Sequence, residues 1–121
     1  MLGDALRLGL VAHVVEADAR DPLAFLEQCG SRFDVTVSCV KCAGAEQAAV
    51  LATRPEGTIC FFGMSTSFTS AAPTAEGVGR QVNMLIGNGY RPGHADLALS
   101  LVRGIPGLMD LLTASIRDPS A

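Results

Sequence analysis

The stretch from Thr58 to Tyr90 decides the fold. It contains two apolar segments, Thr58-Ile-Cys-Phe-Phe-Gly-Met64 and Gln81-Val-Asn-Met-Leu-Ile-Gly-Asn-Gly-Tyr90, and each runs into glycine and polar residues at its C-terminal end. This pattern is typical of strands in a buried parallel sheet whose carboxyl ends open onto a ligand crevice. The two strand exits, residues 63–67 and 87–90, are therefore the first candidates for chemistry.

Composition indicates a globular chain of one domain. The 121 residues are 49% hydrophobic and 17% charged, which is ample apolar material for a core. The formal net charge is -3, the sequence pI is about 5.2, and the basic residues are scattered singly along the chain. Such a chain has no basic face that could follow a phosphate backbone, so we expect no nucleic-acid partner.

The sequence has no apolar run that approaches the roughly 18 residues of a membrane-spanning helix, and its N-terminus lacks a signal-peptide pattern. We therefore expect a cytoplasmic protein with no membrane partner. The cysteines at positions 29, 39, 42 and 60 lie in or beside apolar segments, which favours small buried hydrophobes. Cys39 and Cys42 have CxxC spacing, but no second pair or nearby His completes a zinc site, so a structural role is favoured over a redox role.

Periodicity and turn residues predict an alternation of helices and strands. The expected strands are His13–Asp18, Phe33–Val40, Thr58–Phe62 and Val82–Ile86. The expected helices are Met1–Leu8 with Gly9 as its cap, a helix from Asp21 and Pro22 to Gly30, Glu46–Ala52, and His94–Val102, which Gly104 interrupts and Pro106 restarts. Arg54–Gly57 reads as a turn. The connection from Ser65 to Gln81 is too polar and glycine-broken for one long helix, although Pro73–Glu76 has the composition of a helical turn.

These elements predict an α/β fold, namely an incomplete Rossmann-like three-layer domain. Its sheet is mostly parallel, has about four strands and carries helices on both faces. The domain is expected to cover residues 1–117, with a frayed tail at residues 118–121.

Five motifs resemble a known family. They are Phe33–Val40, Gly57–Phe68, Ala75–Gly79, Ile86–Tyr90 and the Gly93-His-Ala95 that follows. Together they are similar to the C-terminal part of the L-erythro-3,5-diaminohexanoate dehydrogenase family, within the medium-chain dehydrogenase/reductase group. The resemblance implies an oligomeric NAD- or NADP-dependent oxidoreductase of lysine fermentation, which converts the 3-amino group of its diamino acid substrate to a ketone.

The same resemblance identifies parts that this sequence lacks. Such enzymes carry a catalytic domain ahead of a Rossmann domain that begins with a Gly-rich phosphate-binding turn, and no GxGxxG spacing occurs here. In the strand order 3-2-1-4-5-6 the sequence would supply strands 3, 4, 5 and 6, so His13–Asp18 would lack its neighbours. We therefore expect a fragment that is inactive alone.

The group's architecture also implies where the cofactor would lie. The implied cofactor-binding residues are Asp18, Ala19, Arg20, Val40, Lys41, Gly44, Phe62, Gly63, Met64, Ser65, Gly87, Asn88 and Gly89. Glu76 and His94 are the acid–base candidates, since amine oxidation needs a base for the ammonium group. Thr66 and Ser67 are candidates for substrate binding. No metal site is expected, because His13 and His94 are far apart in sequence and have no carboxylates at ligand spacing.

Simpler interpretations stay open for each candidate. The glycines could form tight turns without a ligand, Asp18 and Arg20 could be a helix cap and a solvated side chain, and Lys41 could be an exposed loop residue. Two other functions also remain open. One is a dehydrogenase of the same group with a different substrate, and the other is a non-catalytic α/β module that assembles with a partner chain. The sequence does not distinguish NAD from NADP.

Overall fold

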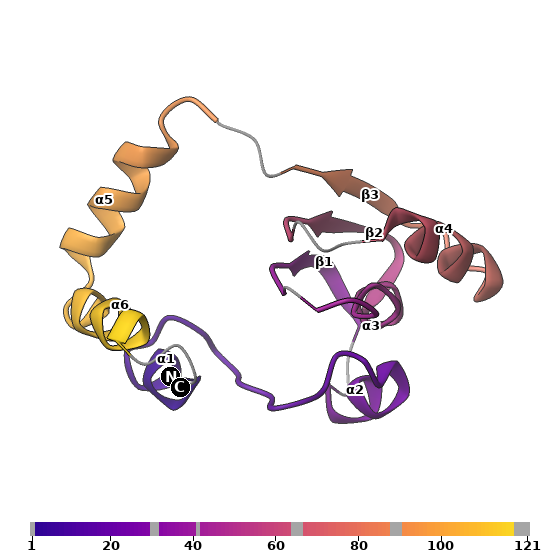
Figure 1. Cartoon of the computed structure of the whole chain (residues 1–121), viewed down its shortest axis with the longest axis horizontal. Helices are drawn as coiled ribbons and strands as arrows, with labels where there is room; N and C mark the ends of the chain where they lie inside the picture. The colour runs from indigo at the N-terminus through magenta and orange to yellow at the C-terminus, as the bar shows by residue number, and fades with distance from the viewer. Residues whose placement is uncertain (1, 30–31, 41, 64–66, 88–90, 118–121) are drawn as a thin grey trace. The chain divides into compact units, whose positions relative to one another are not determined.

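The computed structural model of the chain describes residues 2–29, 32–40, 42–63, 67–87 and 91–117 (Figure 1). The chain divides into two compact units. Residues 15–89 form one, and residues 1–14 with 90–121 form the other. The assignment of residues 1–117 to one Rossmann portion stays a prediction.

The unit 15–89 is built on a parallel sheet of three strands, β1 (Phe33–Ser38), β2 (Thr53–Phe61) and β3 (Asn83–Ile86), in the order β1-β2-β3. In the register of the sheet, Val37 pairs with Cys60 and Cys60 with Leu85. The α/β class and the open parallel sheet of a partial Rossmann-like domain are thus confirmed. The described residues contain three strands, whereas about four were expected.

The expected first strand is wrong. Residues 13–18 are described and have no strand conformation. The physical reason is that the sheet of the described residues consists of β1, β2 and β3, so the backbone groups of this segment have no neighbouring ladder there.

Two helices connect the strands and form the core with one face of the sheet. They are α3 (Glu46–Ala52), as expected, and α4 (Phe68–Gly77). Ile59 and Phe61 alternate onto the same face of β2 and pack against Val50 of α3 and Ala71 of α4. The small side chain of Ala71 lets α4 lie close to the sheet, and Figure 1 shows both helices beside the strands.

The helix α4 corrects the expectation of an irregular connection from Ser65 to Gln81. It is ten residues long and contains Pro73, which cannot donate a backbone hydrogen bond. Proline and glycine have low helix propensities, which is why no long helix was expected. Burial of Ala71, which is 0% exposed, outweighs that local cost.

The expected turn at Arg54–Gly57 lies inside β2 as an irregularity of the ladder. The register moves from the Phe33–Thr53 pair to the Val35–Thr58 pair, so β2 has extra residues at this point. Glu56 adopts a positive φ of 63° there, and its N–H donates to the Gln81 carbonyl at 2.7 Å. The strand continues through this segment.

A third helix of this unit, α2 (Pro22–Cys29), begins as predicted. The Asp21 carboxylate accepts a hydrogen bond from the Ala24 N–H at 3.1 Å, which is an N-cap contact with Pro22 at the first helical position. The helix contacts α3. Gly30, its predicted stop, lies outside the described residues.

The second unit contains α1 (Leu2–Arg7), α5 (His94–Gly104) and α6 (Leu108–Arg117). Gly9, with φ 68°, ends α1 in a Schellman motif, since the Leu10 N–H donates to the Ala5 carbonyl at 2.9 Å. The predicted interruption at Gly104 is found as a break between Gly104, the last residue of α5, and Leu108, the first residue of α6. Within the described ranges no single helix is long and apolar enough to cross a membrane; α5 and α6 have the length and composition of a span only when taken together, and they are bent by 105° at their break.

The cysteines differ from expectation. None of them is in a disulfide, but none is fully buried either: Cys39 is exposed, and the other three are half-buried. Cys39 leaves the sheet directly after β1, and Cys60 points to the face of the sheet opposite Ile59 and Phe61. Partial burial raises the pKa of the Cys29 thiol.

Candidate functional site

The exits of the three strands lie side by side at one edge of the sheet, as parallel strands require. The carbonyl of Ser38, the last residue of β1, accepts the N–H groups of Phe62 at 2.9 Å and Gly63 at 3.2 Å. The carbonyl of Phe61 accepts the N–H of Gly87 at 3.3 Å. The chain after β2 is therefore held against β1, and the chain after β3 against β2.

Two exit glycines border open space. A Cβ added at Gly44 or at Gly87 would have no heavy atom within 4 Å, and Gly44 has a φ of 93° that L side chains rarely adopt. Beside them Val40 and Phe62 expose 43% and 52% of their surface. A ligand could therefore approach the backbone closely at these exits.

A buried carboxylate joins two of the exits. Glu46, the first residue of α3, is 2% exposed. Its Oε2 accepts the N–H of Gly44 at 3.0 Å, and its Oε1 accepts the N–H of Ser67 at 2.6 Å. The sequence analysis missed Glu46, because a glutamate in the first turn of a helix is so common. Its position two residues after an exit glycine is the only signal that could have pointed to it.

A small apolar cavity of about 120 Å³ lies beside the exit of β1. Its lining includes Ala19, Phe25, Val40 and Ala45. Ala19 therefore lies near Val40, as the cofactor assignment of both residues requires. The cavity is smaller than the ~300 Å³ or more of typical ligand pockets, so it could accept only part of a ligand.

Two curated relatives match the chain. L-erythro-3,5-diaminohexanoate dehydrogenase of Acetoanaerobium sticklandii is 43% identical over 103 residues, which is 81% of this chain and 30% of the relative. The enzyme of the same name from Fusobacterium nucleatum subsp. nucleatum is 38% identical over 95 residues, which is 74% of this chain and 28% of the relative. This sequence is related to part of L-erythro-3,5-diaminohexanoate dehydrogenase. It spans less than a third of the length of these relatives, and no family profile matches it.

Five of the predicted cofactor-binding residues lie at the three strand exits. Val40, Gly44, Phe62, Gly63 and Gly87 belong to the three adjacent exits. The others predicted there, Lys41, Met64, Ser65, Thr66, Asn88 and Gly89, lie outside the described residues.

Asp18 and Arg20 form a local ion pair. The Arg20 Nη2 lies 2.7 Å from Asp18 Oδ2, and the Arg20 backbone N–H donates to Asp18 Oδ1 at 2.9 Å. These contacts lower the pKa of Asp18 to about 2, with the guanidinium hydrogen bond as the main cause. Both charges are thus engaged with each other beside Ala19, which lines the cavity.

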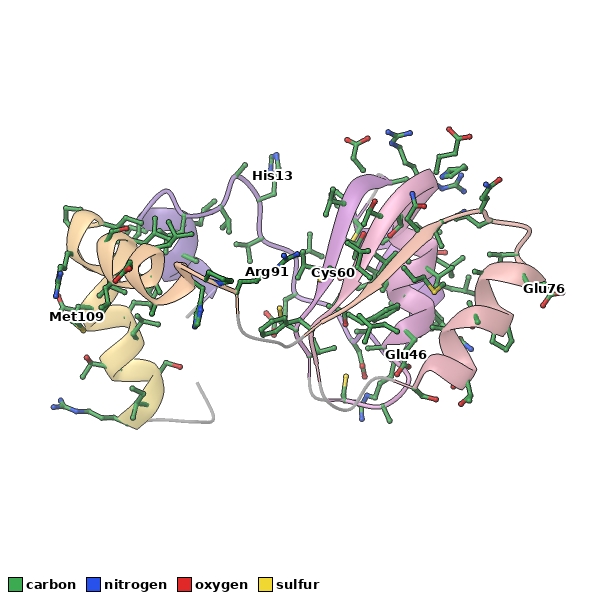
Figure 2. The ribbon with its side chains drawn as sticks, turned by 90° about the horizontal axis from the view of Figure 1, so that it is seen from above. His13, Glu46, Cys60, Glu76, Arg91 and Met109 are labelled. Atoms are coloured by element: carbon green, nitrogen blue, oxygen red, sulfur yellow. The ribbon has the colours of Figure 1, made fainter. Side chains whose placement is uncertain are left out.

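The two acid–base candidates belong to different units of the chain. Glu76 is exposed near the C-terminal end of α4, which carries the chain back from the exits toward the start of β3; Figure 2 shows it at the outer end of the helix, away from Glu46. His94 belongs to the other unit, where its Nδ1 lies 2.7 Å from the Arg91 carbonyl. Ser67, a substrate candidate, has its hydroxyl 2.9 Å from the Thr69 hydroxyl within the first turn of α4.

The exits offer backbone groups and open glycines against which part of a dinucleotide could lie. Adjacent backbone groups and open glycines suit a flat ring that lies against strand ends, as in other doubly wound sheets. The pyrophosphate half needs a Gly-rich turn with GxGxxG spacing, which the sequence does not contain. Among the described residues, no group of three or more His, Cys, Asp or Glu side chains could hold a metal ion.

Proposed function

We propose that this sequence contributes the nicotinamide side of an NAD or NADP site in an oxidoreductase that acts on L-erythro-3,5-diaminohexanoate. The observation that carries the proposal is the junction of three strand exits at Ser38, Phe61 and the open glycine Gly87. The names of the two relatives support the substrate and a dehydrogenase reaction. We propose that this reaction is an oxidative deamination that yields a 3-keto acid. The same geometry would also serve a related dehydrogenase with another substrate.

In this proposal each exit holds a different part of the cofactor. Val40 and Gly44 lie against the ribose next to the nicotinamide, Phe62 and Gly63 against the nicotinamide ring, and Gly87 against its carboxamide. When bound, the nicotinamide supplies the hydride acceptor. The residues of this chain bind and orient the ring, largely through backbone groups and the exposed Phe62 side chain.

The proposed reaction also needs acid–base chemistry. An amine oxidation needs a group that takes the ammonium proton, within hydrogen-bond reach of the substrate. Glu76 lies away from the exits, and His94 belongs to the other unit, so we propose them only as the acid–base residues that this sequence offers.

We expect the 121-residue chain by itself to bind a dinucleotide weakly and to lack turnover, because the phosphate-binding turn is not in its sequence. The matched experiment uses half of the cofactor. The ¹⁵N-labelled chain is titrated with reduced nicotinamide mononucleotide, with AMP and with NADH. The mononucleotide should shift the amide signals of Gly44, Phe62, Gly63 and Gly87. The dissociation constant of NADH should be millimolar or weaker. AMP should leave these four signals unchanged.

Two results would overturn the proposal in different ways. Absence of mononucleotide-induced shifts at the exits would remove the nicotinamide assignment. Micromolar binding of NADH by the chain would instead contradict the half-site, since it would require a complete dinucleotide site.

A second candidate function is assembly with a partner chain, and exposed apolar residues on one face of the sheet favour it. Val35, Val37 and Leu85 lie on the face opposite α3 and α4 and are 61%, 57% and 57% exposed. Apolar strand residues on a sheet face are usually covered. Sedimentation of the purified chain tests this function. A stable dimer or complex that the Val37→Lys variant dissociates would favour the assembly module.

A further inference from the structure

The two exits that Glu46 connects come from different parts of the chain. Gly44 precedes Glu46 by two residues, whereas Ser67 follows it by twenty-one and begins α4 as its N-cap residue. Figure 2 shows Glu46 beside the ends of the strands. One carboxylate therefore fixes the chain after β1 relative to the chain after β2.

Burial makes this contact energetically important. A carboxylate that is 2% exposed has lost most of its hydration, and its oxygens must be compensated by donors within the protein. Among the described residues, the donors to the Glu46 carboxylate are the backbone N–H groups of Gly44 and Ser67. Hydrogen bonds to an ionised carboxylate are shorter and stronger than neutral ones, which agrees with the 2.6 Å contact to Ser67.

The chain after β2 is thus held at two points. It leaves the sheet with the N–H groups of Phe62 and Gly63 on the Ser38 carbonyl, and it enters α4 with the N–H of Ser67 on Glu46. Because Glu46 also holds Gly44, its side-chain length sets the spacing between the first exit and the second.

We infer that Glu46 is a positioning residue that sets the spacing of the β1 and β2 exits for the nicotinamide ring. The inference rests on the proposed function for its ligand. The coupling of Gly44 to Ser67 through the Glu46 carboxylate does not depend on the proposed function.

The test compares three variants of the 121-residue chain by amide hydrogen exchange and by titration with reduced nicotinamide mononucleotide. Glu46→Gln keeps the side-chain volume but replaces one carboxylate oxygen by an NH₂ group. One of the two backbone N–H groups then faces a donor and loses its hydrogen bond. Glu46→Asp keeps the charge but is shorter by one methylene, so it cannot span both donors. Glu27→Gln removes an exposed carboxylate from α2 and is the matched control.

We expect Glu46→Gln and Glu46→Asp each to speed exchange at Ser67 or Gly44 by about tenfold or more relative to Ile59 in the core of β2. The mononucleotide-induced shifts at Gly44 and Gly63 should weaken in both, and Glu27→Gln should behave as the unmodified chain. The ratio to Ile59 separates a local release of the exits from a general loss of stability.

Unchanged exchange ratios in both Glu46 variants would overturn the inference. Exchange ratios in Glu46→Asp equal to those of the unmodified chain would also overturn it, because a negative charge would then suffice without the side-chain length that reaches both N–H groups. If the unmodified chain gives no mononucleotide shifts at all, the proposed function fails. The exchange ratios still decide in that case whether Glu46 sets the spacing of the exits.

Discussion

The hydroxyl oxygens of Thr53 and Thr36 lie 2.7 Å apart, and the Thr53 hydroxyl also donates to the Ala49 carbonyl at 2.7 Å. Thr53 is 0% exposed and is the first residue of β2. Through these two contacts its side chain connects β2 to β1 and to the last turn of α3. At the α3–β2 junction, the backbone carbonyls at the C-terminal end of α3 lie next to the core and need hydrogen-bond donors.

Thr53→Val should therefore destabilise the chain by about 1–3 kcal/mol, since it keeps the shape but removes the buried hydroxyl that contacts Thr36 and Ala49 and leaves the Ala49 carbonyl with the residue-53 N–H as its remaining donor. Urea unfolding measures the difference. Thr113→Val, which removes a hydroxyl bonded within α6, is the control and should cost less than about 0.5 kcal/mol. Equal costs for the two variants would show that the buried position of Thr53 has no special importance.

Arg80 stabilises the same junction from the other side. Its Nη1 donates to the carbonyls of Val50 at 3.1 Å, Leu51 at 2.5 Å and Thr53 at 3.0 Å, which are the C-terminal carbonyls of α3 and the start of β2. A helix C-terminus leaves such carbonyls without partners and favours a positive charge. We expect Arg80→Met to cost about 1–3 kcal/mol in urea unfolding, and Arg103→Met, on an exposed part of α5, to cost almost nothing. A near-zero cost at Arg80 would contradict this account.

Local sequence signals predicted most elements of the fold. The Asp21–Pro22 start of α2, the bounds of α3 and the Gly9 cap depend on residues within one helical turn, and the structure agrees with them. The errors came from long-range effects. The helix α4 exists despite Pro73 because Ala71 packs on the sheet. Residues 13–18 form no strand because the sheet that the structure describes offers them no neighbouring strand.

The candidate site was predictable in its backbone and not in its side chains. Parallel topology alone brings the exits at Gly63 and Gly87 together, so glycine-containing strand ends were a sufficient signal. The contact between Glu46 and Ser67 joins residues twenty-one positions apart, and helical periodicity carries no information about it. The same holds for Glu76, since the sequence did not show which end of α4 would lie at the exits.

The Asp18–Arg20 pair predicts a titration at unusually low pH. Hydrogen bonds from the Arg20 guanidinium and then from its backbone N–H lower the pKa of Asp18 from the ordinary 3.8 to about 2. A lowered folded-state pKa means that the pair stabilises the chain above about pH 4, and that this contribution is lost as the pH falls through about 2. The carboxyl ¹³C signal of Asp18 should show this midpoint. Arg20→Gln should move the midpoint upward, and an unchanged midpoint would exclude Arg20 as the cause.

Gly57 offers the sharpest test of the irregular part of β2. A Cβ at this position would lie 2.7 Å from Thr53 Cγ2 and 2.9 Å from the carbonyl oxygens of Arg54 and Asp34. Two of these three atoms are backbone, so a small rotation of one side chain cannot relieve the overlap. We expect Gly57→Ala to destabilise the chain by about 1–3 kcal/mol or more in urea unfolding, through overpacking between β1 and β2.

Gly77→Ala is the matched control for Gly57→Ala. Gly77 is the last residue of α4 in the same unit, and an added Cβ there would meet nothing within 4 Å. This substitution should be neutral or should stabilise the chain by up to about 1 kcal/mol, because alanine loses less conformational freedom than glycine on entering a helix. If both variants unfolded at the same urea concentration, the close approach of β1 to the irregularity in β2 would not exist in solution. A selective loss at Gly57 would establish that a side chain is excluded where the ladder between these strands changes register.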